Sequence, residues 1–161
     1  MLKKILLFLL IALIVIQFIH PEKNKADGEQ TNYIGNVFPV SEKVKVILAK
    51  ACNDCHSNNT NYPWYTNIQP VHWWMNNHIA EGKKEINFDD YKNRSLRFQY
   101  HKMEEIVKQV KEGEMPLDSY TWIHKDAKLS EVEKTELINW ADGIMDSLKA
   151  NYPIDSLIRK K

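Results

Sequence analysis

The chain has 161 residues, with 22 lysines and arginines against 21 aspartates and glutamates, and a formal net charge of +1. A charge so near zero gives no electrostatic reason to propose a nucleic acid or an acidic polymer as a partner. Once an apolar start and a polar end are set aside, the length allows one domain of roughly 110–120 residues. We expect a signal anchor or signal peptide over 1–20, a polar linker over 21–36, one domain over 37–150, and a polar, basic tail over 151–161.

Residues 1–20 have the pattern of an export signal, because Lys3 and Lys4 precede an entirely apolar run over 5–16. The apolar residues number about 15–16, fewer than the roughly 20 that span a bilayer comfortably. No Ala-x-Ala-like cleavage site follows, which favours a retained signal anchor over a removed signal peptide. Either interpretation predicts an exported domain, in a bacterium in the periplasm, and a retained helix would anchor it to the cytoplasmic membrane.

The next two segments lead into the chemically informative stretch. Residues 21–36 are polar and lack apolar periodicity, which predicts a tether. Apolar residues then recur at i, i+3, i+4 and i+7 from Val44 to Ala51, after a possible helix cap at Ser41. This spacing predicts an amphipathic helix that ends where residue 52 begins.

Residues 52–56 read Cys-Asn-Asp-Cys-His and contain both cysteines of the chain. Cys-x-x-Cys-His is the signature of c-type haem attachment, in which two thiols add to the vinyl groups of a haem and the imidazole reaches the iron. Residues three and four apart share one face of a helical turn, so Cys52, Cys55 and His56 can meet one porphyrin. The motif predicts one haem c, attached through Cys52 and Cys55, with His56 as the proximal iron ligand.

The cysteine pair has two other interpretations. A thioredoxin-like redox pair would follow a buried strand, whereas the residues before Cys52 are helix-like. A zinc site would need two further ligands at matching spacing, and no other cysteine exists. Export also favours thioether bonds, since two bare neighbouring thiols outside the cytoplasm tend to oxidise. A disulfide or zinc pair stays open as the alternative.

The middle of the chain offers two histidines near the predicted haem. Residues 57–70 predict an Asn- and Pro-rich loop, and 71–79 a helix with His78 on its apolar face and a stop at Gly82. An inward histidine is more often a hydrogen-bonded core residue than a ligand, and it could also bind a haem propionate. His78 is therefore a secondary candidate for the distal ligand, and His72, beside Val71, is a further one.

Met115 is the main candidate for the sixth iron ligand. It lies in a Gly-Glu-Met-Pro loop after a predicted helix over 95–112 that Gly113 ends. A thioether is a soft ligand that suits haem iron opposite histidine, although methionine is also an all-purpose packing residue. His124 is its rival in the next segment.

The remaining expectations concern the last helix and the tryptophans. Ser130 and Glu133 form a capping-box pattern that starts a helix running to about residue 149, and residues 159–161 form a basic tail that we expect to be solvated. Large aromatic side chains suit a flat apolar cofactor. The tryptophans expected to line its pocket and exclude water are Trp64, Trp73, Trp74 and Trp122.

The order of these elements resembles the cytochrome c fold, in which the first and last helices cross beside the haem. Further motifs are Tyr-Pro-Trp-Tyr at 62–65, Pro-Val-His-Trp-Trp at 70–74 and His-Ile-Ala-Glu-Gly at 78–82. With the motif at 52–58 and Gly-Glu-Met-Pro at 113–116, they make residues 36–148 similar to the small exported haem-binding domains common in Bacteroidetes. This resemblance implies an all-α domain around one haem, attached through Cys52 and Cys55 and bound by His56 and, as the distal ligand, by Met115.

Three functions are compatible with such a domain. A membrane-tethered electron carrier needs both axial positions of the iron filled, and it is our leading hypothesis. A sensor or ligand-binding module needs an open or weakly ligated sixth position. A peroxide-reducing enzyme would also need a distal acid or base, for which His78 and His124 are candidates.

Overall fold

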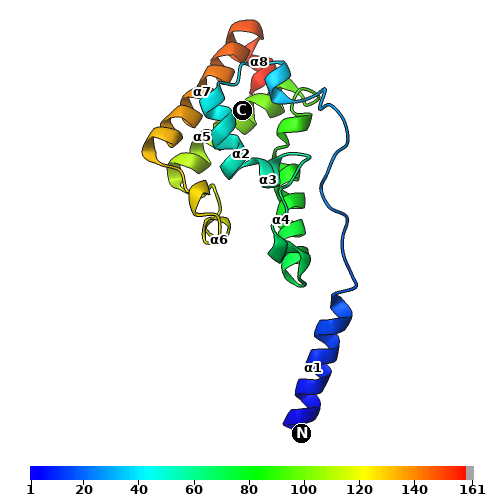
Figure 1. Ribbon diagram of the computed structural model, residues 1–161. Coiled ribbons are helices and arrows are strands. Elements are labelled where there is room, and N and C mark those ends of the chain that lie inside the picture. Colours follow the sequence, from blue (N-terminus) through cyan, green and yellow to red (C-terminus); the bar gives the residue numbers. More distant parts are fainter. Residues whose placement is uncertain (159–161) are drawn as a thin grey trace.

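The computed structural model describes residues 1–158, and the regular secondary structure in that range is helical apart from one isolated bridge (Figure 1). The α-helices are α1 (Leu2–Ile16), α2 (Glu42–Ala51), α3 (Asn53–His56), α4 (Val71–Glu85), α5 (Leu96–Glu112), α6 (Asp118–Thr121), α7 (Glu131–Asn151) and α8 (Ile154–Leu157). Short 3-10 turns are η1 (Ile34–Asn36), η2 (Trp64–Asn67), η3 (Phe88–Asp90) and η4 (Lys125–Ala127). The expected all-α class is confirmed, and the basic tail over 159–161 lies outside the described residues.

Helix ends follow the local sequence signals closely. The side chains of Ser41, Ser95 and Ser130 each accept a hydrogen bond from the backbone three residues on, at the starts of α2, α5 and α7. Ser130 and Glu133 complete the expected capping box. Gly113 ends α5 with φ +76°, a conformation that glycine adopts without strain.

The core lies where α5 and α7 pack along each other, with α2 and α8 against them. Its most deeply buried members include Leu48, Met103, Leu137 and Leu148. Burying one such side chain contributes about 1.5–3 kcal/mol, so this apolar cluster dominates the stability of the domain. The expected polar tail joins it in part, because Leu157 of α8 is fully buried there.

Helix α4 is longer than the sequence suggested. The prediction that Gly82 stops this helix is wrong, since α4 continues to Glu85. Gly82 instead lies against the loop of the two cysteines: a Cβ there would approach the Cys55 carbonyl oxygen to 2.8 Å. The missing side chain thus permits close contact between α4 and α3.

The N-terminal helix α1 has no buried residue and projects away from the domain, near the beginning of α4 (Figure 1). Within residues 1–158, no helix combines the length and apolarity needed to cross a membrane. The residues that follow α1 dock on the domain. Gln17 and Gln69 exchange hydrogen bonds at 3.1 and 2.9 Å, and the Ile19 carbonyl accepts from the Gln69 amide and the Trp73 indole at 2.8 and 3.0 Å.

Residues 21–36, expected as a free tether, also contact the domain. The Asn24 amide donates to the Ser57 carbonyl and to Thr60 Oγ1, both at 2.9 Å, and Lys25 forms the isolated bridge with Asn59. Ile34 is fully buried in the core. The segment is polar because it pairs with another polar segment, a long-range contact that its own pattern does not reveal. The domain boundaries themselves stay a prediction.

Candidate functional site

The Cys-x-x-Cys-His segment forms one tight turn at the end of α2. The Cys52 carbonyl accepts hydrogen bonds from the backbone N–H groups of Cys55 at 3.1 Å and His56 at 2.9 Å. Cys52, Cys55 and His56 all line one cavity of about 540 Å³. The turn predicted from the spacing therefore presents both sulfur atoms and the imidazole to a common space.

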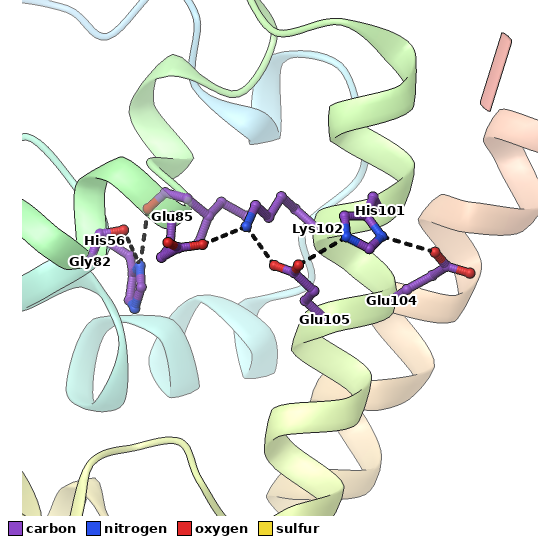
Figure 2. Close-up of polar contacts among 8 residues, drawn as sticks. His56, Gly82, Glu85, His101, Lys102, Glu104 and Glu105 are labelled. Carbon is purple, nitrogen blue, oxygen red and sulfur yellow. Dashed lines mark hydrogen bonds and ion pairs between the residues drawn. The ribbon is translucent and has the colours of Figure 1, made fainter. Parts of the chain in front are cut away.

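The His56 imidazole is held by backbone carbonyls at the end of α4 (Figure 2). Its Nδ1 lies 2.9 Å from the Gly82 oxygen and 3.0 Å from the Ile86 oxygen. Both partners can only accept, so Nδ1 carries the proton and Nε2 carries the lone pair. Burial lowers the pKa of His56, although the two carbonyls oppose that shift, so the neutral form is favoured. A neutral imidazole with a fixed Nε2 lone pair is suited to bind a metal ion.

An ion-pair cluster connects this end of α4 to α5 (Figure 2). Lys102, whose side chain is only 11% exposed, pairs with Glu85 at 2.7 Å and with Glu105. The outer end of the cluster is His101, which contacts Glu104 and Glu105. Burial opposes the charge on Lys102, but its hydrogen bonds to Glu105 and Glu85 outweigh this and raise its pKa. Glu85 and Lys102 thus bring opposite charges close to the His56 imidazole.

A second cavity, of about 290 Å³, adjoins the first through shared walls. We call the two together the cleft. The residues that line both are Ala51, Cys52, His56, Glu85, Met115 and Pro116. The smaller cavity is walled mainly by apolar side chains, among them Leu48, Phe88, Ile106, Val110 and Leu137. The cleft can therefore enclose a flat apolar group beside the motif, with Met115 and His56 on its walls.

The two cysteine thiols are partly buried at the wall of the cleft. Both are free, and burial raises the pKa of Cys52 to about 12 and that of Cys55 to about 11. A thioredoxin-like thiol would show the opposite shift, since its reactivity depends on a lowered pKa. Among the described residues, no three or more His, Cys, Asp or Glu side chains group as they would around a metal ion. The redox-pair and zinc interpretations gain no support.

The histidines weighed against Met115 lie in different settings. His124 stacks on Tyr120 at 4.2 Å, and its Nε2 is 2.7 Å from the Tyr65 hydroxyl. His72 is almost completely buried, and neither of its ring nitrogens has a hydrogen-bond partner among the described residues. Only His78 lines the cleft, and its Nε2 is buried without a partner in the described part of the chain.

The four tryptophans are not where we expected them. None is among the described residues that line the cleft, and Trp64 and Trp122 are 76% and 71% exposed. Trp73 donates its indole N–H to Ile19, and Trp74 packs edge-on against His78 at 4.7 Å. Aliphatic side chains and Phe88 wall the cleft instead. Composition shows how many aromatic side chains exist, but not which of them face inward.

Two features of the site were missed in the sequence. Asp54, between the cysteines, accepts hydrogen bonds from the Tyr120 hydroxyl at 2.7 Å and the Asn61 backbone at 2.8 Å, so it fixes the loop around the motif. The acidic and basic residues of the Glu85 cluster belong to separate helices. A carboxylate inside the motif was a visible signal for the first feature, but only the tertiary fold reveals the second.

The arrangement defines a class of protein: a helical domain with an apolar cleft, two thiols and one oriented imidazole. A model of the haem-binding domain family matches residues 11–143, so the chain belongs to that family. No curated protein and no solved structure matches. The donor set fits a haem, because the apolar walls suit a porphyrin face and the His56 Nε2 lone pair suits its iron. Haem binding, expected from the sequence, is thereby confirmed at the level of the family.

Proposed function

We propose that the protein is a c-type electron carrier that holds one haem covalently through Cys52 and Cys55. The observation that carries the proposal is the orientation of the His56 imidazole, whose Nδ1–H donates to the Gly82 and Ile86 carbonyls. The Nε2 lone pair is therefore available to bind a haem iron in the cavity that His56 and Cys52 both line. A bound haem supplies an iron that changes by one electron between the ferric and ferrous states.

The residues of the chain have separate roles in this proposal. His56 is the proximal ligand, and the two carbonyls keep its ring in one tautomer and orientation. Met115 supplies the sixth ligand, which favours the ferrous state relative to a second histidine. The apolar side chains of the smaller cavity exclude water from the cofactor, which also raises the reduction potential.

We further propose that α1 is retained and anchors the domain to the outer face of the cytoplasmic membrane, with the cleft in the periplasm. Support comes from the exposed apolar side chains of α1 and from the lysines that precede them, Lys3 and Lys4. The docking of Ile19 on Gln69 and Trp73 favours retention, because cleavage in this region would remove acceptors from two donors of the domain.

The experiment is intact mass and optical spectroscopy of protein from cells with and without a cytochrome maturation system. We expect a denatured mass increased by one haem only with maturation, and no increase in the Cys52→Ala/Cys55→Ala variant. The mass also reports whether residues 1–20 are present. A chain without covalent haem under maturing conditions contradicts the proposal.

The sixth ligand is tested on the same material. Ferric protein with methionine ligation shows a near-infrared charge-transfer band, which Met115→Ala should abolish while the attached haem remains. His78→Ala and His124→Ala are the matched variants and should keep the band. If Met115→Ala leaves the spectrum unchanged and His78→Ala alters it, His78 is the ligand. Carbon monoxide binding by the wild-type ferrous protein would favour a sensor.

A further inference from the structure

Three of the tryptophans that do not line the cleft are exposed on the outside of the domain. Trp64, Trp74 and Trp122 are 76%, 49% and 71% exposed, and Ile68 and Ile123 beside them are also exposed. We call these five residues the aromatic face. Large apolar patches rarely stay uncovered on soluble proteins, so this surface is expected to contact something apolar.

Contacts connect the chain segments that carry the aromatic face. Trp74 and Ile123 line the same small hollow, together with Tyr65. Trp64 packs edge-on against Tyr65 at 6.0 Å, and the Tyr65 hydroxyl is 2.7 Å from His124. These contacts hold η2, the start of α4 and the chain after α6 together.

The same end of the domain receives α1. Just after α1, Gln17 exchanges hydrogen bonds with Gln69, and the Ile19 carbonyl accepts from Gln69 and Trp73. Gln69 and Trp73 lie between Ile68 and Trp74 in the sequence. Phe18 and Ile19 at this junction are themselves exposed. Figure 1 shows α1 extending away from the beginning of α4, the helix that carries Trp74, and α1 has no buried residue.

The length of α1 determines how close its flanking residues lie to a membrane that it enters. Its 15 residues, at about 1.5 Å of rise each, give roughly 22 Å, against a hydrocarbon layer of about 30 Å. A helix shorter than the hydrocarbon layer is accommodated by local thinning of the bilayer, which leaves the flanking residues close to the membrane surface. Tryptophan is the residue enriched at that depth, where its ring is buried and its N–H stays hydrated.

We propose that the aromatic face rests in the headgroup region of the membrane leaflet that α1 enters, an inference that depends on the proposed anchoring by α1. Lys23 lies beside this region, over the Tyr62 ring and bonded to Asn67, where its charge can meet lipid phosphates. The hollow beneath the face is also lined by Cys55 and Tyr120. The domain is thus held in one orientation, with the Cys55 side of the cleft toward the membrane.

The experiment uses the full-length holoprotein in vesicles of phosphatidylethanolamine and phosphatidylglycerol that contain a lipid with a photoreactive diazirine near its headgroup. After illumination, mass spectrometry identifies the labelled residues. We expect lipid adducts on α1 and on the peptides around Trp64, Trp74 and Trp122. Peptides with Val46 and Val132, which are exposed and apolar but lie outside the face, should be labelled several-fold less.

A double variant tests the aromatic face independently of the anchoring by α1. Trp64→Ser/Trp122→Ser should lose labelling around positions 120–124 and keep labelling of α1, whereas Val46→Ser/Val132→Ser should match the wild type. Labelling of α1 without labelling of the face overturns this inference and leaves the anchoring intact. Absence of adducts on α1 contradicts the anchoring itself. Crosslinks between copies through the face would show that a second chain covers it, and would also overturn the inference.

Discussion

Gly82 and Cys55 approach so closely that a methyl group on Gly82 would lie 2.8 Å from the Cys55 carbonyl oxygen. The same glycine places its own carbonyl oxygen 2.9 Å from Nδ1 of His56. One residue of α4 therefore sets both the spacing of the cysteine turn and the orientation of the imidazole. This contact leads to the first prediction.

Gly82→Ala should destabilise the protein by about 1–3 kcal/mol, since the added methyl forces α4 away from the turn. The displacement also weakens the bonds to His56, so we expect less haem per chain. Chemical unfolding and haem quantification measure the two effects. Gly143→Ala is the matched control, because this glycine of α7 has no atom within 4 Å of the added Cβ. It should be neutral or stabilise by up to about 1 kcal/mol, and equal losses in both variants would refute our explanation.

The second prediction concerns charge near the proposed haem. Glu85 and Lys102 line the cleft with opposite charges, and removing one of them should shift the reduction potential. Lys102→Met should favour the ferric state and Glu85→Gln the ferrous state, each by up to about tenfold, or about 59 mV for one electron. Potentiometric titration at about pH 8, where carboxylates are ionised, measures both shifts.

Two comparisons make the potential measurements decisive. The double variant should return toward the wild-type value if charge is the cause. Glu131→Gln removes a carboxylate that pairs with Lys134 on α7, outside the cleft, and should leave the potential unchanged. Shifts of the same sign in Glu85→Gln and Lys102→Met would indicate a structural disturbance instead.

The third prediction concerns acid stability. The hydrogen bond from Lys50 and those from Ser130 lower the pKa of Glu133 to about 2 from an ordinary 4.5. Because the folded-state pKa is the lower one, the stabilisation is present above about pH 4.5 and is lost as the pH falls toward 2. Glu133→Gln should lower the free energy of unfolding by about 1 kcal/mol at neutral pH. It should also weaken the dependence of that free energy on pH below about 4.5.

Urea unfolding at a series of pH values tests the acid-stability prediction. Glu136→Gln is the control, since Glu136 forms an exposed ion pair with Lys43. It should leave the acid limb of the profile close to that of the wild type. A Glu133→Gln variant with an unchanged acid limb would count against the assignment.

The fourth prediction concerns the junction of α1 with the domain. Gln69 is almost completely buried, and its amide donates to Ile19 and accepts from the Trp73 backbone. Gln69→Ala should destabilise by about 1–3 kcal/mol and make residues 17–23 more sensitive to protease. Asn77→Ala is the comparison, because it removes an exposed amide that bonds to Glu81 of the same helix. Equal protease sensitivity in both variants would mean that the junction is open in solution.

Local signals were sufficient for much of the fold and for the motif. Ser41 and Ser130 were recognisable as helix caps because a cap depends on residues within one turn. Cys52, Cys55 and His56 could be brought together from spacing alone for the same reason. The haem-binding family was expected from this motif and its neighbours, and the family match over residues 11–143 confirms the family.

Long-range contacts explain the errors. Gly82 looked like a helix stop, but its role depends on Cys55, which lies 27 positions earlier. Trp64 and Trp122 were expected in the pocket because they are large and aromatic, but residue type does not reveal which side of a segment faces inward. Asn24 looked solvated because its partners, Ser57 and Thr60, lie on another segment. Leu157 was assigned to a polar tail because its burial depends on α5 and α7.

The pairing of residues 24–26 with 57–60 also fixes an order of assembly. Asn24 and Ala26 emerge from the ribosome first, but their partners are made only after the Cys-x-x-Cys-His turn. These contacts lie directly beside His56 in the sequence, since the Asn24 amide donates to the carbonyl of Ser57. Residues 24–26 can therefore dock on the domain only after the Cys-x-x-Cys-His segment has been synthesised.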